Sequence, residues 1–247
     1  MDIKCKIPKV LFQTSLKKPP EHVVSMIKEK TPGWDYLFFS DDDIIDYFTS
    51  NPVADFPDIV NKFYSFSNGA HRADLFRYYF LYLNGGVFLD SDAMLEEDIH
   101  SIVRDYEFVS VNSYHNNKQL IFNGFIGTVE KSPILYSALL NLYGTDDSKL
   151  KQDYHWVCKD LFDILVDSGQ ANIMIFQEKK LKLFRAGVIT FNDKRVILKH
   201  YCYTKIIPDY SCKWKNRVYR FIYRYVFLYS GYKMYLIIRK RFRSFFS

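Results

Sequence analysis

The stretch NGGVFLDSDA, from Asn84 to Ala93, constrains the fold of this chain more than any other. Two glycines end the preceding element, a run of three apolar residues follows, and two aspartates stand one residue apart after it. A short apolar run bounded by glycine is typical of a buried strand. Because residues i and i+2 of an extended chain point to the same side, Asp90 and Asp92 are expected to project together from the end of that strand.

Two carboxylates held this close repel each other unless a cation or hydrogen-bond donors compensate their charge. A hard divalent ion is the simplest solution, and Mg²⁺ or Mn²⁺ completes its coordination shell with water and phosphate oxygens. An EF-hand is excluded, because Met94 and Leu95 occupy positions that require Asp or Asn and Gly. The sequence therefore predicts that Asp90 and Asp92 hold Mn²⁺ or Mg²⁺ together with a diphosphate.

The elements around this strand are expected to alternate between strands and helices. Ile7–Thr14 and Tyr36–Phe39 read as strands, a helix is expected from Pro19 to Lys30, and Asp41–Asp43 are expected to cap the next one. Asn68 is the expected N-cap of a helix that Gly85 ends. The remaining expected elements are strands at Tyr106–Val111 and Leu120–Gly127 and helices at Pro133–Tyr143 and Asp153–Val166. This order predicts an α/β fold with a mixed, mostly parallel sheet flanked by helices.

The length and composition fit a single domain. The chain has 247 residues, of which 48% are hydrophobic and 25% charged, and it contains no repeat or low-complexity tract. The pattern changes at Trp214, after which apolar residues recur at helical spacing between arginines. We therefore expect one domain over residues 1–213 and basic amphipathic helices over residues 214–247.

Only in that tail does the charge distribution indicate a binding partner. No acidic residue follows Asp209, whereas ten Lys and Arg do, and residues 1–212 have a net charge of −4. A basic, aromatic tail either binds an anionic membrane surface or packs on the domain with a solvated basic rim. Nucleic acid is not an expected partner, because the body of the chain is acidic and no binding motif is present.

The sequence also bears on the compartment. The first residues lack the apolar run of a signal peptide, and the longest uncharged stretch, Ser132–Thr145, is too short for a membrane span. The four cysteines fit no disulfide framework. The expected location is the cytoplasm, with peripheral attachment to the inner face of a membrane as a further possibility.

The block AHRADLFRYYFLYLNGGVFLDSD, from Ala70 to Asp92, resembles the DxD region of family 32 glycosyltransferases. That family includes fungal initiating α-1,6-mannosyltransferases and bacterial capsular and lipopolysaccharide glycosyltransferases. The opening IPKVLFQT and the segment Pro32–Tyr36 (PGWDY) are similar to further family segments, so the resemblance covers about residues 6–100. It implies a GT-A-type nucleotide-sugar-binding domain.

The resemblance also implies roles for individual residues. Asp90 would contact the ribose and the metal, Asp92 would bind the metal, and Asp74 with Arg77 would bind the hydroxyls of the transferred sugar. Further donor contacts would come from Phe12, Gln13, Thr14, Ser91, Asn123 and Trp214, and the third metal ligand from His200. The alternatives without a functional role are a surface ion pair for Asp74 and Arg77, a structural histidine at position 200 and a simple turn at Asn123-Gly124.

The leading functional hypothesis is a metal-dependent retaining glycosyltransferase. It would move a hexose or N-acetylhexosamine from a UDP- or GDP-sugar to a glycan or lipid-linked saccharide acceptor, in surface polysaccharide synthesis. One alternative is a metal-dependent phosphohydrolase acting on nucleotide or phosphoester substrates. Another is a zinc-stabilised binding module, whose ligands would come from His155, Cys158, His200, Cys202 and Cys212.

Overall fold

The computed structural model describes residues 5–116, 118–180, 188–192, 195–201 and 207. Residues up to Ile207 form one compact unit. The predicted basic helices at 214–247, with Trp214, lie outside the described residues. The described elements are, in chain order, β1 (Val10–Thr14), α1 (Glu21–Lys30), β2 (Asp35–Phe39), α2 (Asp41–Ser50), α3 (Ile59–Ser65), α4 (Gly69–Asn84), β3 (Gly86–Leu89), β4 (Ala93–Leu95), α5 (Ile99–Val103), β5 (Phe108–His115), β6 (Lys118–Ile121), β7 (Phe125–Thr128), α6 (Pro133–Tyr143), α7 (Asp147–Gln152), α8 (Trp156–Asp167), β8 (Ile173–Lys180), β9 (Val188–Asn192) and β10 (Arg195–His200).

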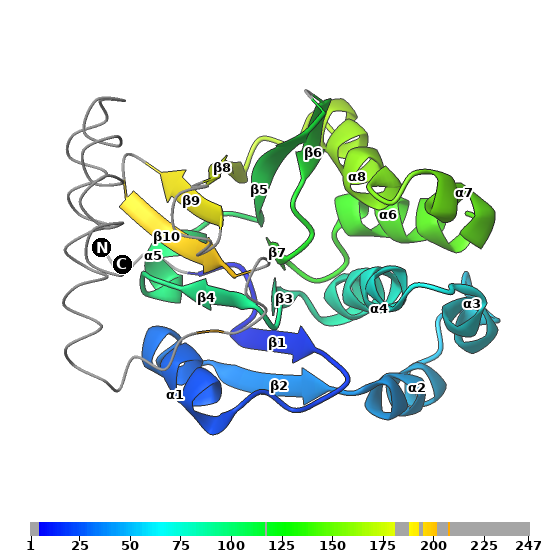
Figure 1. The fold of residues 1–247 in the computed structure, drawn as a ribbon, viewed down its shortest axis with the longest axis horizontal. Helices are drawn as coiled ribbons and strands as arrows, with labels where there is room; N and C mark the ends of the chain where they lie inside the picture. The colour runs from blue at the N-terminus through cyan, green and yellow to red at the C-terminus, as the bar shows by residue number, and fades with distance from the viewer. Residues whose placement is uncertain (1–4, 117, 181–187, 193–194, 202–206, 208–247) are drawn as a thin grey trace, which may run out of the picture. The chain divides into compact units, whose positions relative to one another are not determined.

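The ten strands form one mixed sheet in the order β2-β1-β3-β7-β5-β8-β9-β10-β4, with β6 paired to β5 (Figure 1). β1 pairs in parallel with β2 and β3, and β5 pairs in parallel with β8, whereas the other described pairings are antiparallel. Followed through these pairings, β1, β2, β3, β5, β8 and β10 run in one direction and the other four strands in the opposite one. The predicted α/β class with a mixed sheet flanked by helices is confirmed.

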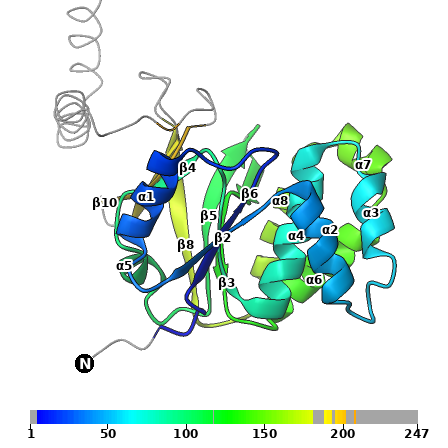
Figure 2. The same ribbon diagram turned by 90° about the horizontal axis from the view of Figure 1, so that it is seen from below.

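Helices cover both faces of the sheet. α1 and α5 lie on one face, and the remaining described helices lie on the other (Figure 2). Neighbouring residues of one strand therefore enter different cores: Leu11 packs on the side of α1, whereas Phe12 packs among the aromatic rings beneath α2 and α4. Because the central strands are buried on both faces, they read as continuous apolar runs rather than as alternating patterns.

The helix that leads to the two aspartates begins and ends as predicted. The side chain of Asn68 caps α4 by accepting a hydrogen bond from the backbone N–H of Ala70. Gly85 ends the helix with φ of 64°, and Gly86 follows with φ of 101°. A Cβ atom at Gly86 would lie 2.7 Å from the carbonyl oxygen of Val10, so only glycine lets β3 approach β1 at this point. The parallel register, with Phe12 opposite Phe88, then places the carboxyl end of β3 beside that of β1.

Two of the expected elements differ from the structure. The single strand expected at Leu120–Gly127 is two strands, because a turn at Phe122 to Gly124 separates β6, which pairs only with β5 among the described strands, from β7, which pairs with β3 and β5. The cap of α2 is Ser40 rather than Asp41–Asp43, since the Ser40 hydroxyl accepts from the Asp43 N–H and the Asp43 carboxylate accepts from the Ser40 N–H. Within the described part of the chain, no helix has the length and apolarity that crossing a bilayer requires.

Candidate functional site

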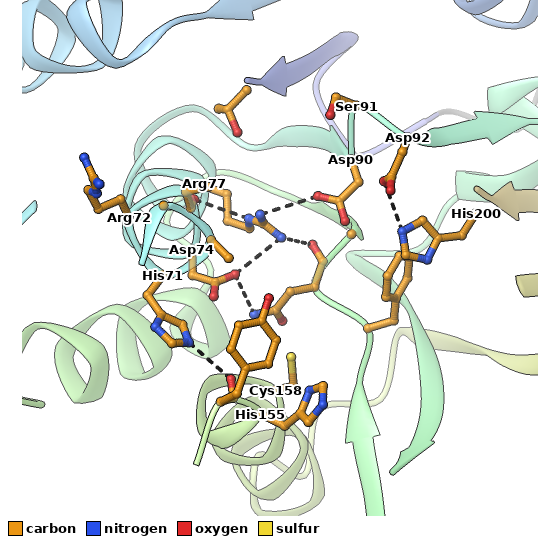
Figure 3. Close-up of a pocket in the computed structure, with 18 of the residues that line it drawn as sticks. His71, Arg72, Asp74, Arg77, Asp90, Ser91, Asp92, His155, Cys158 and His200 are labelled. Carbon is orange, nitrogen blue, oxygen red and sulfur yellow. Dashed lines mark hydrogen bonds and ion pairs between the residues drawn. The ribbon is translucent and has the colours of Figure 1, made fainter. Parts of the chain in front are cut away.

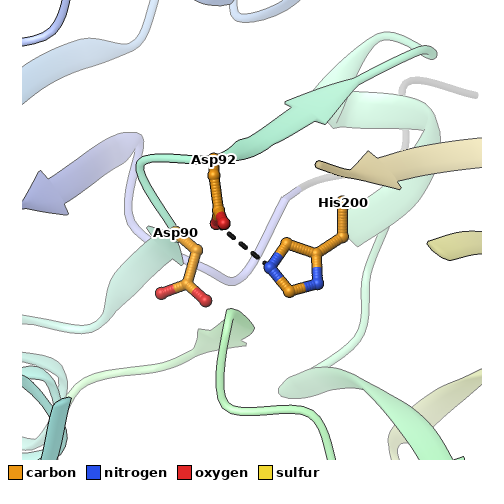
Figure 4. Close-up of side chains that lie close together, drawn as sticks. All are labelled: Asp90, Asp92 and His200. Atoms are coloured by element: carbon orange, nitrogen blue, oxygen red, sulfur yellow. Dashed lines mark hydrogen bonds and ion pairs between the residues drawn. The ribbon is translucent and has the colours of Figure 1, made fainter. Parts of the chain in front are cut away.

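The two aspartates of the DxD stretch lie in the tight connection between β3 and β4. The backbone N–H of Asp90 donates to the Gly124 carbonyl at 2.8 Å, and the Asp90 carbonyl accepts from the Ala93 N–H at 2.9 Å. The same carbonyl accepts a hydrogen bond from Nε2 of the buried Gln13 at 3.0 Å. These contacts fix the backbone of the turn, and both carboxylates face one side of it (Figure 4).

The sheet topology brings His200 to the same place. β4 begins immediately after the DxD stretch, and β10 returns antiparallel to it with His200 opposite Ala93. The Tyr201 N–H donates to the Asp92 carbonyl at 2.7 Å, and Nε2 of His200 lies 3.0 Å from Oδ1 of Asp92. One ligand atom each from Asp90, Asp92 and His200 lie within 4.8 Å of one another. Two carboxylate oxygens and one imidazole nitrogen suit Mn²⁺ well and Mg²⁺ acceptably.

Burial and close spacing shift the pKa values of two of the three groups in this cluster. Burial raises the pKa of Asp90, and the neighbouring Asp92 raises it further against the opposing effects of Arg77 and His200. Burial disfavours charge on His200 as well, but its hydrogen bond with Asp92 and the nearby acids outweigh burial and raise its pKa. A bound cation would relieve the repulsion between the two carboxylates. The residues present therefore fit a divalent metal.

A buried polar network adjoins the cluster. Arg77 lies 3.4 Å from the Asp74 carboxylate and 3.5 Å from that of Asp90, and its Nη1 donates to the Asn123 carbonyl at 2.6 Å. Asn123 donates from Nδ2 to Asp74 at 3.0 Å and accepts from the Tyr78 hydroxyl at 3.0 Å. Burial raises the pKa of Tyr78 well above its usual value, so its hydroxyl remains a donor. The alternative of a surface ion pair for Asp74 and Arg77 is wrong, because both residues are buried.

The cluster lines one cavity of about 880 Å³ together with Asp74, Arg77 and Asn123 of the network (Figure 3). It is lined by Thr14 to Leu16 at the end of β1, by the first turn of α4, by the tip of the β5–β6 hairpin and by the residues that precede α8. The predicted site residues that line this cavity are Thr14, Asp74, Arg77, Asp90, Ser91, Asp92, Asn123 and His200.

Two residues that were predicted to contact the nucleotide-sugar donor do not line the cavity. The side chain of Phe12 is fully buried in the aromatic core, where its ring meets those of Phe39, Phe76, Phe80 and Phe88, so it does not face the cavity. Gln13 is also fully buried, and its side-chain amide donates to the backbone carbonyl of Asp90. Phe12 and Gln13 are buried because β1 is covered on both of its faces. Trp214 lies outside the described residues.

Several cavity residues were not predicted. They include Asp41, Arg72, Tyr114, Tyr154 and Glu178, which come from separate elements that meet only in the folded chain. Gly124, which the sequence singled out together with Asn123, also lines the cavity. The zinc-module alternative finds no support in the described residues, because the cluster that could hold a metal there contains neither His155 nor Cys158. Cys202 and Cys212 lie outside the described residues.

Comparison with known proteins agrees with this geometry. Residues 20–109 match the family described as glycosyltransferase sugar-binding region containing DXD motif. The chain is similar to inositol phosphoceramide mannosyltransferases 3 and 1 of Schizosaccharomyces pombe, with 26% identity over 140 residues and 24% over 144. These matches cover 55% and 56% of this chain but only 37% and 43% of the relatives, so the chain spans less than half the length of either.

Solved structures give more distant matches. The PaToxG glycosyltransferase matches with a TM-score of 0.49 and 14% identity, over 66% of this chain and 70% of that one. The family match encloses Asp74, Arg77, Asp90 and Asp92. Residues 20–109 are therefore similar to the glycosyltransferase sugar-binding regions that contain a DXD motif, which confirms the family resemblance predicted from the sequence.

Proposed function

We propose that the chain is a metal-dependent retaining glycosyltransferase that moves a hexose or N-acetylhexosamine from a UDP- or GDP-sugar to a glycan acceptor. The observation that carries this proposal is that Asp90, Asp92 and His200 share one cavity with the buried pair of Asp74 and Arg77. The DXD sugar-binding region supports it, and the names of the two yeast relatives favour a hexose as the transferred sugar.

The reaction requires a nucleoside diphosphate to leave while positive charge grows at the anomeric carbon. A divalent ion held by Asp90, Asp92 and His200 would neutralise the charge of the departing diphosphate. Asp74 accepts hydrogen bonds from sugar hydroxyls and Arg77 donates to them, and the Asn123 contacts keep both side chains in place. Holding donor and acceptor in reactive geometry contributes up to ~7–11 kcal/mol in ideal cases.

Retention follows from the family resemblance. The acceptor hydroxyl attacks from the face that the diphosphate leaves, so the reaction requires no nucleophile from the protein. The hydroxyl proton passes to the departing diphosphate oxygen. The residues described here then act by binding, orienting and excluding water.

A phosphohydrolase is the less favoured alternative. Among the described residues, Asp90 and Asp92 supply the only carboxylates of the metal cluster, and Asp74 is held by Arg77 and Asn123 instead. The sugar-binding region also favours transfer. Hydrolysis of phosphoesters without a sugar acceptor would distinguish this alternative from the proposed function.

We further propose that the acceptor is carried at a membrane surface. The support is in the sequence, since basic residues alternate with aromatic ones after Trp214 and no acidic residue follows Asp209. Each Lys or Arg near an anionic surface contributes about 1 kcal/mol to binding. Flotation with anionic liposomes should recover the native chain and lose the variant with Arg239, Lys240, Arg241 and Arg243 changed to Gln; equal flotation of both would contradict this part of the proposal.

The function is tested with a panel of UDP- and GDP-sugars in the presence of Mn²⁺, followed by thermal shift and donor hydrolysis. We expect at least one nucleotide to stabilise the native chain, and Asp92→Ala to abolish that shift. Asp163→Ala, which removes an exposed carboxylate on α8, is the matched control and should behave as the native chain does. No stabilisation by any UDP or GDP species would refute the proposal.

A further inference from the structure

The end of the cavity that lies away from the aspartates carries a rim of aromatic rings. The ring of His115, at the end of β5, lies against that of His155 with the centroids 4.1 Å apart and the ring planes tilted by 44°. Tyr154 meets the edge of His155 at 5.1 Å and lies 5.2 Å from His71 of α4. In Figure 3, His71 and His155 lie at the opposite end of the close-up from Ser91 and Asp92. Three separate elements thus supply one aromatic rim.

Two tyrosines on this rim are exposed although they line a cavity. Tyr114 is 47% exposed and Tyr154 is 53% exposed. Each is nevertheless held by a hydrogen bond: Gln119 donates to the Tyr114 hydroxyl at 3.1 Å, and His71 donates from Nε2 to the Tyr154 carbonyl at 3.2 Å. Exposed rings held in a concave site offer apolar contact area at low entropic cost.

The rim also contains an acid. The carboxylate of Glu178 on β8 lines the same cavity and accepts a hydrogen bond from the Ser113 hydroxyl. An ionised carboxylate accepts hydrogen bonds and donates none, so it favours hydroxyl-rich ligands and repels phosphate.

We propose that this aromatic end is the acceptor subsite and that it binds a neutral saccharide. The apolar face of a sugar ring stacks on Tyr154 or Tyr114, and its hydroxyls donate to Glu178. The inference rests on the proposed function: with the donor held by Asp90 and Asp92, the acceptor must enter the same cavity. There the acceptor oxygen bonds to the anomeric carbon, the bond from that carbon to the diphosphate breaks, and the proton leaves on the diphosphate.

The test uses the full chain with Mn²⁺ and saturating UDP or GDP, and it measures binding of methyl α-mannopyranoside and of other neutral methyl hexosides by saturation-transfer NMR. Tyr154→Ala and Tyr114→Ala should each weaken this binding about 3- to 10-fold, as expected for loss of one aromatic contact. Tyr154→Phe keeps the ring and should bind as the native chain does. Tyr64→Ala removes an equally exposed tyrosine outside the cavity and should change nothing.

Stabilisation of the same variants by Mn²⁺ with UDP or GDP separates this proposal from the function on which it rests. Native stabilisation by nucleotide in all variants, with saccharide binding weakened in Tyr154→Ala and in Tyr114→Ala, supports the subsite. Nucleotide stabilisation with no saccharide binding, or with binding unaffected by both alanine variants, overturns the subsite and leaves the function standing. Tighter binding of mannose 6-phosphate than of the neutral glycosides would overturn the neutral class. If nucleotide stabilised neither the native chain nor any variant, the proposed function itself would be refuted.

Discussion

Nε2 of His200 lies 3.0 Å from Oδ1 of Asp92, although 108 positions separate the two residues in the chain. The antiparallel pairing of β10 with β4 creates this contact, because it sets His200 opposite Ala93. The third candidate metal ligand therefore depends on the register of a strand far along the sequence. The site is complete only when both ends of the domain have folded.

The affinity for Mn²⁺ should fall as the pH falls, since a metal binds only neutral imidazole. The pKa of His200 is raised above its usual 6.5, so the loss should begin at a higher pH than for an ordinary histidine. The stability of the metal-free chain depends on pH in the opposite direction. Because the pKa of His200 is higher in the folded chain than in the unfolded one, protonated His200 stabilises the fold at pH values below the unfolded-state pKa. This stabilisation is lost as the pH rises through the folded-state pKa. Titration calorimetry from pH 8 to pH 6 measures the first effect. In His200→Asn the affinity should be weaker and its pH dependence flatter, and a native affinity independent of pH in this window would contradict the assignment.

Gln13→Met should loosen the DxD turn. Gln13 is fully buried, donates to the Asp90 carbonyl and accepts from the Tyr36 hydroxyl at 2.9 Å. Burial raises the pKa of Tyr36 to about 12, so this hydroxyl stays protonated and would lose its acceptor. We expect a loss of about 1–3 kcal/mol in the free energy of unfolding and about tenfold in Mn²⁺ affinity. Tyr36→Phe is the control, because it leaves the bond from Gln13 to Asp90 intact and should keep nearly native Mn²⁺ affinity; equal loss in both variants would argue against a positioning role.

Gly124→Ala should displace the Asp90 carboxylate. A Cβ atom at Gly124 would overlap Oδ2 of Asp90 and the ring of Phe122. Because both are side-chain ends that can move, we expect a cost of about 1–3 kcal/mol in stability, with the clearer effect on Mn²⁺ binding. Gly144→Ala is a fair comparison, since its Cβ would meet ordinary contacts of 3.5 Å and more. Denaturant unfolding and Mn²⁺ titration of both variants measure the two effects, and native metal affinity in Gly124→Ala would contradict the expected displacement of the Asp90 carboxylate.

Arg77→Met should be costly for the fold. It would leave the Asp74 carboxylate buried without its cation and would remove the stacking of the guanidinium over Phe88, now at 4.0 Å from the ring centroid. Breaking a buried pair from one side costs about 3–5 kcal/mol. Arg72→Met, on the same helix, breaks the more exposed pair with Asp41 and should cost about 1 kcal/mol or less. Urea unfolding of the two variants measures the difference, and similar costs for both would mean that the buried pair contributes little.

The part of the site that could be predicted from the sequence has local signals. Asn68 and Gly85 mark the ends of α4, and the spacing within α4 places Asp74 beside Arg77. The apolar run after Gly86 identifies β3 and with it the paired aspartates. Each of these features is encoded by residues that lie close together in the sequence, so propensity and periodicity are enough to predict it.

The remainder depends on contacts between distant elements. No periodicity places His200 beside Asp92, and that prediction came from family resemblance alone. The aromatic end joins Tyr114, Tyr154 and Glu178 from three elements whose meeting is set by sheet order. Phe12 was misplaced for a related reason, since burial of β1 on both faces leaves no alternation that separates a core side from a ligand side.

The most direct measurement of the central claim is a titration of the native chain with Mn²⁺, followed by electron paramagnetic resonance, with and without UDP or GDP. If Asp90, Asp92 and His200 hold the ion that carries the diphosphate, one Mn²⁺ binds per chain, the matching nucleotide tightens it, and Asp92→Ala loses both effects while Asp163→Ala retains them. Nucleotide binding that persists unchanged in the presence of a chelator, or Mn²⁺ binding that Asp92→Ala leaves intact, would contradict the account.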